Sequence, residues 1–179
     1  MAFQRPANRG AKAHVARAVV ALVAAAALAV AGALAFFEPV REPELVLRDS
    51  RGHTLGKIRL PDGHFSHVFV HSFHLTPVEE RFMIEPKGLS GARMRLYELR
   101  YQSPGVGMPA DAEGGYRLEN GFFVLSMDRV FDTIPVLVSI VPGHGIVAGG
   151  SLRPFRDWAA PEEALRLSAR MAIVFRPRR

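Results

Sequence analysis

The residues best suited to chemistry gather in one stretch, HFSHVFVHSFHLTPVEE, at positions 64–80. This stretch holds four of the seven histidines of the 179-residue chain and ends in two glutamates. Imidazole and carboxylate groups are common zinc ligands and common acid–base groups of enzymes. The stretch therefore indicates a metal site, a catalytic cluster, or a β-hairpin that is merely rich in histidine.

A metal site built from this stretch alone is not expected. Zinc ligands must converge on one ion at about 2.0–2.1 Å. The β-branched and aromatic residues predict a strand over 66–73. At roughly 3.3 Å per residue, this strand separates His67 from His71 by about 13 Å. His74 would point to the opposite face, and His64 would lie in the preceding turn. We therefore treat His64, His67 and His74 as bystanders, and expect no bound metal.

Two combinations around His71 remain open. With Glu79 or Glu80 it would form a metal-binding pair across the hairpin. With Thr76 as nucleophile and Glu79 as orienting acid it would fill the roles of a periplasmic hydrolase. Ser72 is a poorer nucleophile for His71, because adjacent strand residues point to opposite faces. The chain also lacks a Gly-x-Ser-x-Gly elbow. We expect a binding protein without a cofactor, and keep the hydrolase as the alternative.

A glycine-rich segment, SPGVGMPADAEGG, follows at positions 103–115. Such a loop can expose backbone N–H groups to an anion. It lacks the Lys-Ser/Thr pair and the strand-to-helix context of a phosphate-binding loop. We interpret it either as a binding loop on a β scaffold or as plain turn chemistry. His144, between two glycines in PGHGI, is expected to be an exposed turn residue.

The expected functional surface is the 71–80 hairpin facing the 101–115 loop. Its candidate ligand-binding or partner-binding residues are His71, Ser72, Thr76, Glu79, Glu80, Gly105, Gly107 and Glu113.

The elements that must position these residues are short β-strands. Alternating Leu and Ile side chains on either side of the turn SRGH predict a hairpin. Apolar residues also alternate from Leu165 to Phe175, which places them on one face of a strand. One helical turn is expected near FRDWAAPEEA. Further strands are predicted at RFMI, RMRLYELRY, GFFVLSMD and IPVLVSIV, the last covered on both faces. Seven to nine short antiparallel strands imply an all-β sandwich or small barrel.

An N-terminal hydrophobic helix is expected to precede the β domain. Residues 18–37 carry no charge, and twenty helical residues span roughly 30 Å, enough to cross a bilayer core. Four Lys/Arg precede the segment, so the positive-inside rule places residues 1–17 in the cytoplasm. The segment would be a signal anchor or, with small residues at 31–35, a cleaved signal peptide. Residues 38–44 would be a spacer.

The rest of the chain, 45–179, would be an extracytoplasmic domain. It would lie in the periplasm or at the cell exterior, tethered to the bacterial inner membrane, or free there if the leader is cleaved.

The net charge of +6 does not indicate nucleic-acid binding. Residues 1–37 contribute +4 and the C-terminal tail three arginines, so the domain itself is near −1. A nucleic-acid surface carries its positive charge on the folded domain. The absence of cysteine excludes disulfides, thiolate ligands and cysteine nucleophiles.

Five motifs in order resemble the bacterial family known as domain of unknown function 1850. They are HSFHLTPVEE (71–80), YQSPGVGMP (101–109), EGG (113–115), NGFFVLS (120–126) and VPGHGIVAGG (141–150). The resemblance runs from about residue 45 to the C-terminus and includes His71, Thr76, Glu79 and Glu80.

The resemblance implies a small extracytoplasmic domain often encoded beside TAXI-type TRAP transporters, which import small anionic solutes. It implies no activity. We therefore expect a membrane-tethered binding or assembly accessory whose partner is the transporter permease or the TAXI solute-binding protein. A hydrolase and a metal-binding accessory protein are the alternatives.

Overall fold

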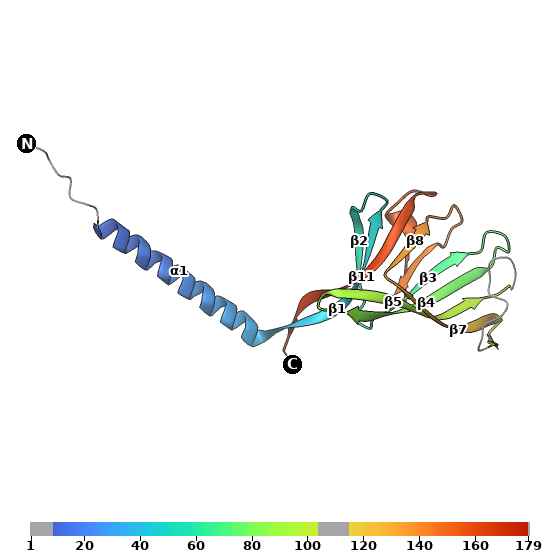
Figure 1. Cartoon of the computed structure of the whole chain (residues 1–179), viewed down its shortest axis with the longest axis horizontal. Coiled ribbons are helices and arrows are strands. Elements are labelled where there is room, and N and C mark those ends of the chain that lie inside the picture. The colour runs from blue at the N-terminus through green and yellow to red at the C-terminus, as the bar shows by residue number, and fades with distance from the viewer. Residues whose placement is uncertain (1–8, 104–114, 179) are drawn as a thin grey trace, which may run out of the picture. The chain divides into compact units, whose positions relative to one another are not determined.

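The computed structural model describes residues 9–103 and 115–178 (Figure 1). Three of the expected site residues, Gly105, Gly107 and Glu113, lie outside these ranges. The chain divides into two compact units. The first comprises Met1–Val40 and Val174–Arg179, and the second comprises Arg41–Ile173.

The first unit is built around one long helix, α1 (Arg9–Phe36). Its alanine-rich sequence has a high intrinsic helix propensity. At its end, the backbone N–H of Arg178 donates to the carbonyl oxygen of Phe36 at 2.8 Å. Within residues 9–103 and 115–178, no helix combines the length and the apolar character needed to cross a membrane.

Antiparallel β-structure makes up the second unit, with β1 and β11 continuing into the first. The strands are β1 (Phe37–Asp49), β2 (Thr54–Arg59), β3 (His64–Val70), β4 (Pro77–Lys87), β5 (Gly91–Tyr101), β6 (Tyr116–Glu119), β7 (Phe122–Phe131), β8 (Thr133–Leu137), β9 (Gly145–Ala148), β10 (Ser151–Pro154) and β11 (Ala164–Pro177). A single 3₁₀ turn, η1 (Phe155–Asp157), lies in the segment where one helical turn was expected.

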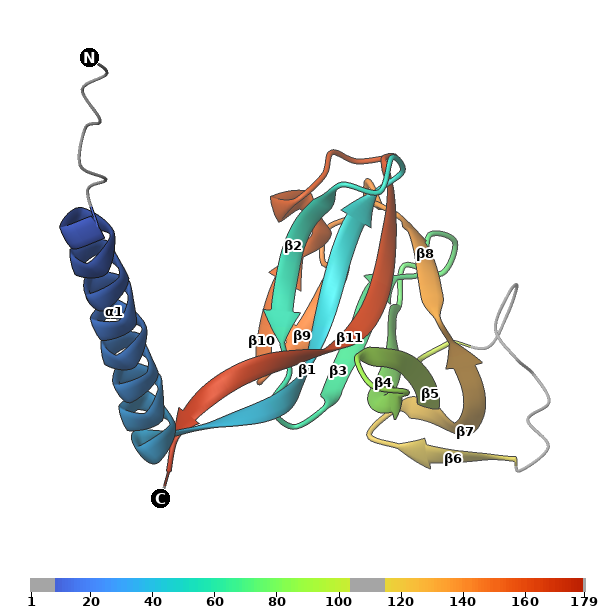
Figure 2. The same ribbon diagram turned by 60° about the vertical axis from the view of Figure 1, so that its left-hand side comes forward.

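The strands form one continuous sheet that curls into a half-barrel (Figure 2). Its order is β10-β9-β3-β4-β5-β11-β1-β2, with β7 also paired to β5, β6 to β7 and β8 to β11. The all-β class is confirmed. Eleven strands lie in the described residues, more than the seven to nine expected, because the short strands β6, β9 and β10 have too few residues to show a clear period.

Local sequence accounts for several of the turns. The β1–β2 hairpin turns at SRGH as expected. The β6–β7 hairpin turns at Asn120 and Gly121, whose φ angles are 49° and 80°. Two consecutive positive φ values are the requirement of a type I′ turn, which Asn-Gly meets with little strain.

Two segments differ from the sequence-based expectations. The expected spacer 38–44 lies within β1, and Glu42 and Glu44 are buried there. In β8, buried and exposed residues alternate: Ile134 and Val136 are buried, whereas Leu137 is exposed. The strand is therefore covered on one face rather than two.

The main core cluster draws on most strands of the curled sheet and includes the C-terminal strand, which is confirmed. Leu165 and Leu167 of β11 are almost completely buried, as their alternation predicted. The rings of Phe65 and Phe82 stack with centroids 4.9 Å apart across β3 and β4. Burial of each such side chain contributes about 1.5–3 kcal/mol to stability.

Candidate functional site

Three histidines, two close together at β3 and one from a distant part of the sequence, line one cavity of about 420 Å³. They are His67 on β3, His71 just after β3, and His144 just before β9. Val136 and Leu137 of β8 supply part of its apolar wall. His67 and His144 are both buried, with 8% of their surface exposed.

The sheet register brings the first polar partner to His67. In the antiparallel β3–β4 pair, His67 lies directly opposite Glu80. Side chains of opposed residues project from the same face, and Nδ1 of His67 lies 2.8 Å from Oε2 of Glu80.

The second partner of His67 comes from the other neighbour of β3. Strand β9 pairs with β3, and His67 lies opposite Ile146. His144, two residues before Ile146, places its Nε2 atom 2.9 Å from Nε2 of His67. The backbone N–H of Ser139 then donates to Nδ1 of His144 at 2.9 Å. Glu80, His67, His144 and Ser139 thus form one hydrogen-bonded chain.

The chain fixes the proton positions on both rings. Nδ1 of His144 accepts from a backbone N–H, so the proton of the neutral ring must be on Nε2. That Nε2–H donates to Nε2 of His67, whose own proton is therefore on Nδ1 and donates to Glu80. Each of the three hydrogen bonds has one donor and one acceptor only in this arrangement.

Electrostatics keep His144 neutral. Burial, together with a smaller contribution from the neighbouring His67, lowers the pKa of His144 to about 4. A proton added to Nε2 of His67 would face the N–H of His144, and a proton added to Nδ1 of His144 would face the backbone N–H of Ser139. His144 is therefore neutral near pH 7.

The same protonation pattern disfavours metal binding by the pair. A metal-binding nitrogen must offer a lone pair, but Nε2 of His144 carries the proton. In the described part of the chain, no three His, Cys, Asp or Glu side chains are grouped in a way that would hold a metal ion.

His71 organises the turn between β3 and β4, defined here as the 71–76 turn. Its Nδ1 accepts from the backbone N–H groups of Phe73 and His74, each at 3.3 Å. Its backbone N–H donates to the carbonyl of Thr76 at 2.8 Å, and its carbonyl accepts from the N–H of Leu75 at 2.8 Å. The strand therefore ends at Val70, three residues earlier than expected.

The 71–76 turn also carries three unfavourable features. Phe73 and Leu75 are 75% and 69% exposed. Leu75 has a φ of 52°, a conformation that suits glycine rather than leucine. In the described residues, Nε2 of His74 is the one buried side-chain nitrogen or oxygen without a hydrogen-bond partner.

Glu79 is engaged away from this turn. Its Oε1 accepts from Ser66 Oγ at 2.7 Å and from Arg81 Nε at 3.0 Å. Burial alone would raise the pKa of Glu79, but hydrogen bonds from Arg81 and Ser66 outweigh that effect and lower it. Glu79 and Glu80 point to opposite faces of β4, so the structure groups Glu79 with Ser66 and Arg81, and Glu80 with His67.

The expected site residues thus separate into groups. His71 and Ser72 line the cavity, and Glu80 reaches it through His67. Thr76 closes the turn through its carbonyl group.

Sequence reasoning missed the two buried histidines. His67 was expected to be a bystander and His144 an exposed turn residue, whereas both are buried in the cavity wall. The pairing of β9 with β3 brings His144 to His67 across 77 positions. Sequence reasoning could have found the contact between His67 and Glu80, because the register of the β3–β4 hairpin by itself places these two residues opposite each other.

Comparisons with known proteins bear on this same region. No curated protein and no solved structure matches the chain. A family model described as domain of unknown function (DUF1850) matches residues 65–155, just over half of the chain. The matched range contains the whole hydrogen-bonded chain and the 71–76 turn, and on this match the protein belongs to the DUF1850 family.

Proposed function

We propose that the protein is an extracytoplasmic accessory of a TAXI-type TRAP solute transporter, and that it docks onto a transporter subunit through the 71–76 turn. The protein partner would be the permease or the solute-binding protein. The observation that carries the docking proposal is the concentration of unfavourable features in this one turn, next to the histidine cavity.

A partner that covers the turn would bury the exposed side chains of Phe73 and Leu75. An unpaired buried polar atom costs about 1–3 kcal/mol, and a non-glycine residue at positive φ costs a similar amount. Two large exposed side chains, Phe73 and Leu75, add apolar surface that a partner would bury. Leu137, 64% exposed, extends this apolar surface along the cavity.

The chemistry of the turn favours a protein partner over a lipid surface. Nε2 of His74 lies between the two apolar residues in sequence and needs a hydrogen-bond partner. A protein groove can offer a polar group at a defined position beside apolar pockets. The backbone hydrogen bonds of His71 with Thr76 and Leu75 hold the turn in place, which reduces the entropy lost on docking.

The position outside the cytoplasm is part of the same proposal. It is supported by the basic residues before position 18 and by the uncharged segment 18–37.

The hydrolase alternative has weaker support. It needs His71, Thr76 and Glu79 together, and Glu79 is occupied by Ser66 and Arg81. A metal-binding accessory built on His71 with Glu79 or Glu80 has weaker support as well, because Glu79 bonds Ser66 and Arg81 whereas Glu80 bonds His67.

Replacement of Leu75 by glycine tests the docking contact without lowering the stability of the isolated protein. Leu75→Gly removes an apolar contact but relieves the positive φ, so the isolated protein should be as stable as the wild type or about 1 kcal/mol more stable. We expect co-purification with the transporter subunit and solute uptake to fall at least tenfold. Both are measured in cells that express the full-length protein with the transporter.

Leu89→Ser is the matched control, because Leu89 is 81% exposed in the β4–β5 turn. It should leave both measurements unchanged. Undiminished co-purification and uptake with Leu75→Gly would refute the docking proposal.

A further inference from the structure

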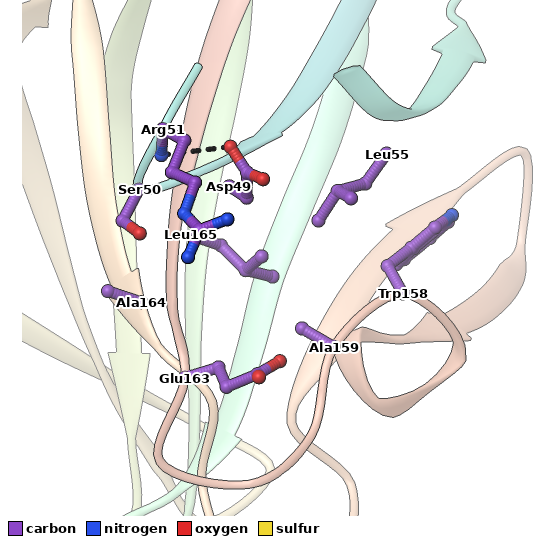
Figure 3. A pocket seen from close by; sticks show the side chains of 9 residues that line it. All are labelled: Asp49, Ser50, Arg51, Leu55, Trp158, Ala159, Glu163, Ala164 and Leu165. Carbon is purple, nitrogen blue, oxygen red and sulfur yellow. Dashed lines mark hydrogen bonds between the residues drawn. The ribbon is translucent and has the colours of Figure 1, made fainter. Parts of the chain in front are cut away.

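A second cavity, of about 540 Å³, lies between the β1–β2 turn and the segment that leads into β11 (Figure 3). Its volume falls within the range of about 300–1,000 Å³ that is usual for small-molecule sites. Its lining combines an apolar surface with three charged side chains, Asp49, Arg51 and Glu163.

The apolar surface is formed by Leu55, Trp158 and the buried Leu165. Trp158 is held in place from two sides. Its backbone N–H donates to the carbonyl of Phe155 at 3.0 Å. Its indole lies so close to Gly56 of β2 that a Cβ at this glycine would overlap Nε1. The glycine therefore allows the ring to pack flat beside the cavity.

Arg51 contributes a positive charge to this cavity. Its backbone N–H donates to Asp49 Oδ1 at 2.9 Å. The backbone N–H of His53 also donates to Asp49 Oδ1, and the His53 ring nitrogen Nδ1 hydrogen-bonds to Asp49 Oδ2. Asp49 is thus used to close the hairpin turn. Among the described residues, no carboxylate pairs with the guanidinium of Arg51.

Glu163 contributes the negative charge. Its Oε2 accepts from the backbone N–H of Ala160 at 2.9 Å, which orients the carboxylate. In Figure 3 the side chains of Arg51 and Glu163 come from separate segments, with Leu165 between them. Within the described residues the two charges form no ion pair with each other, although both line the same cavity.

We propose that this cavity binds a small zwitterion, namely an α-amino acid with an apolar side chain. Arg51 would take the carboxylate through two parallel N–H···O bonds, the geometry that guanidinium groups favour. Glu163 would take the ammonium group. The apolar side chain would lie on Leu55, Leu165 and Trp158. This inference is independent of the docking proposal, which concerns a different surface.

The only tryptophan of the chain lines this cavity, so its fluorescence reports on occupancy there. The experiment titrates the full-length protein with three probes. Leucine carries both charges, 4-methylpentanoate lacks the ammonium group, and 3-methylbutylamine lacks the carboxylate. We expect a saturable fluorescence change with leucine, and at least tenfold weaker binding of the other two probes.

Two charge variants test which charged group of the ligand each residue binds. Arg51→Gln should weaken leucine binding about tenfold or more. Glu163→Gln should weaken leucine binding but leave the weaker 4-methylpentanoate unaffected or improved. The glutamine amide oxygen can still accept from Ala160, so the turn should be retained, and an unchanged melting temperature verifies this. Arg129→Gln, at an exposed position outside the cavity, should leave all three titrations unchanged.

Two sets of results would contradict the proposal. Equal binding of leucine and 4-methylpentanoate, with no effect of Glu163→Gln, would overturn the zwitterion assignment. The absence of a saturable change with leucine, or full leucine affinity in Arg51→Gln, would overturn the site.

Discussion

The contact between His67 and His144 depends on which ring nitrogen carries the proton. Two imidazoles can share a hydrogen bond at 2.9 Å only when one nitrogen donates and the other accepts. The backbone N–H of Ser139 at one end and Glu80 at the other assign these roles. A main-chain donor therefore determines the protonation of a side chain two hydrogen bonds away.

This assignment predicts the tautomer of each ring. Near pH 7, His144 should be neutral with its proton on Nε2, and His67 should carry its proton on Nδ1. Nitrogen chemical shifts of the imidazoles in ¹⁵N-labelled protein distinguish the two forms. A His144 ring protonated on Nδ1 would mean that Ser139 does not donate to it, and that the chain of hydrogen bonds is wrong.

The low pKa of His144 predicts a loss of stability in mild acid. Its folded-state pKa is about 4, whereas its usual value is 6.5. Between these values the unfolded state binds the proton more readily, so stability rises with pH from 4 to 6.5 and is lost on acidification. The full effect is on the order of 3 kcal/mol. Urea unfolding at a series of pH values measures it.

His144→Asn tests whether His144 is the source of this pH-dependent stability. The asparagine side-chain oxygen can still accept from Ser139 but does not titrate. The variant should be less stable near pH 7 and show a flatter pH dependence above pH 4. His64→Asn, at an exposed histidine, should keep the wild-type dependence. An equal slope in wild type and His144→Asn would assign the effect to other groups.

At the scale of elements, the site is a product of three adjacent strands, β9, β3 and β4. Strand β3 carries His67, strand β4 carries Glu80, and His144 lies just before β9. Gly145, the first residue of β9, lies tightly against β10. A Cβ at this position would lie 2.5 Å from the carbonyl oxygen of Arg153 and 2.9 Å from Cα of Pro154.

Gly145→Ala is therefore expected to destabilise the protein by about 1–3 kcal/mol, because backbone atoms of β10 must move to admit the methyl group. Urea unfolding measures the loss. The displacement should also disturb the imidazole nitrogen shifts of the adjacent His144. Ser151→Ala, at an exposed position of β10, serves as control, and equal stability of the two variants would show that the hairpin tolerates the added volume.

Local patterns predicted the elements better than their long-range pairing. The alternation from Leu165 to Phe175 and the turn SRGH predicted β11 and the β1–β2 hairpin, because both depend on neighbouring residues. The pairing of β9 with β3 joins segments that are some eighty positions apart, and no local period encodes it. For this reason the 71–80 segment was recognised as a candidate site, whereas His144 was taken for an exposed turn residue.

At the scale of the whole molecule, charge and apolar surface are distributed unevenly. Most of the excess positive charge lies in the first 37 residues and at the C-terminus, outside the nearly neutral domain. The exposed apolar side chains of the 71–76 turn lie on that domain. Docking through an apolar surface of a nearly neutral domain should be only weakly sensitive to salt.

This distribution predicts how the complex responds to ionic strength. Under the docking proposal, co-purification of the full-length protein with the proposed transporter subunit should persist as the salt concentration is raised from 50 to about 500 mM. Retention on the tagged subunit across a salt series measures this. A steep loss at moderate salt would indicate that charged groups, rather than Phe73 and Leu75, dominate the contact.

The central claim, that the 71–76 turn docks onto a transporter subunit, is tested most directly by site-specific photo-cross-linking in whole cells. A photoreactive phenylalanine analogue replaces Phe73 in one strain and Leu89 in another. The account predicts a cross-link from position 73 to the permease or the solute-binding protein, and none from position 89. Cross-linking at position 73 to lipid alone, or equally from both positions, would contradict it.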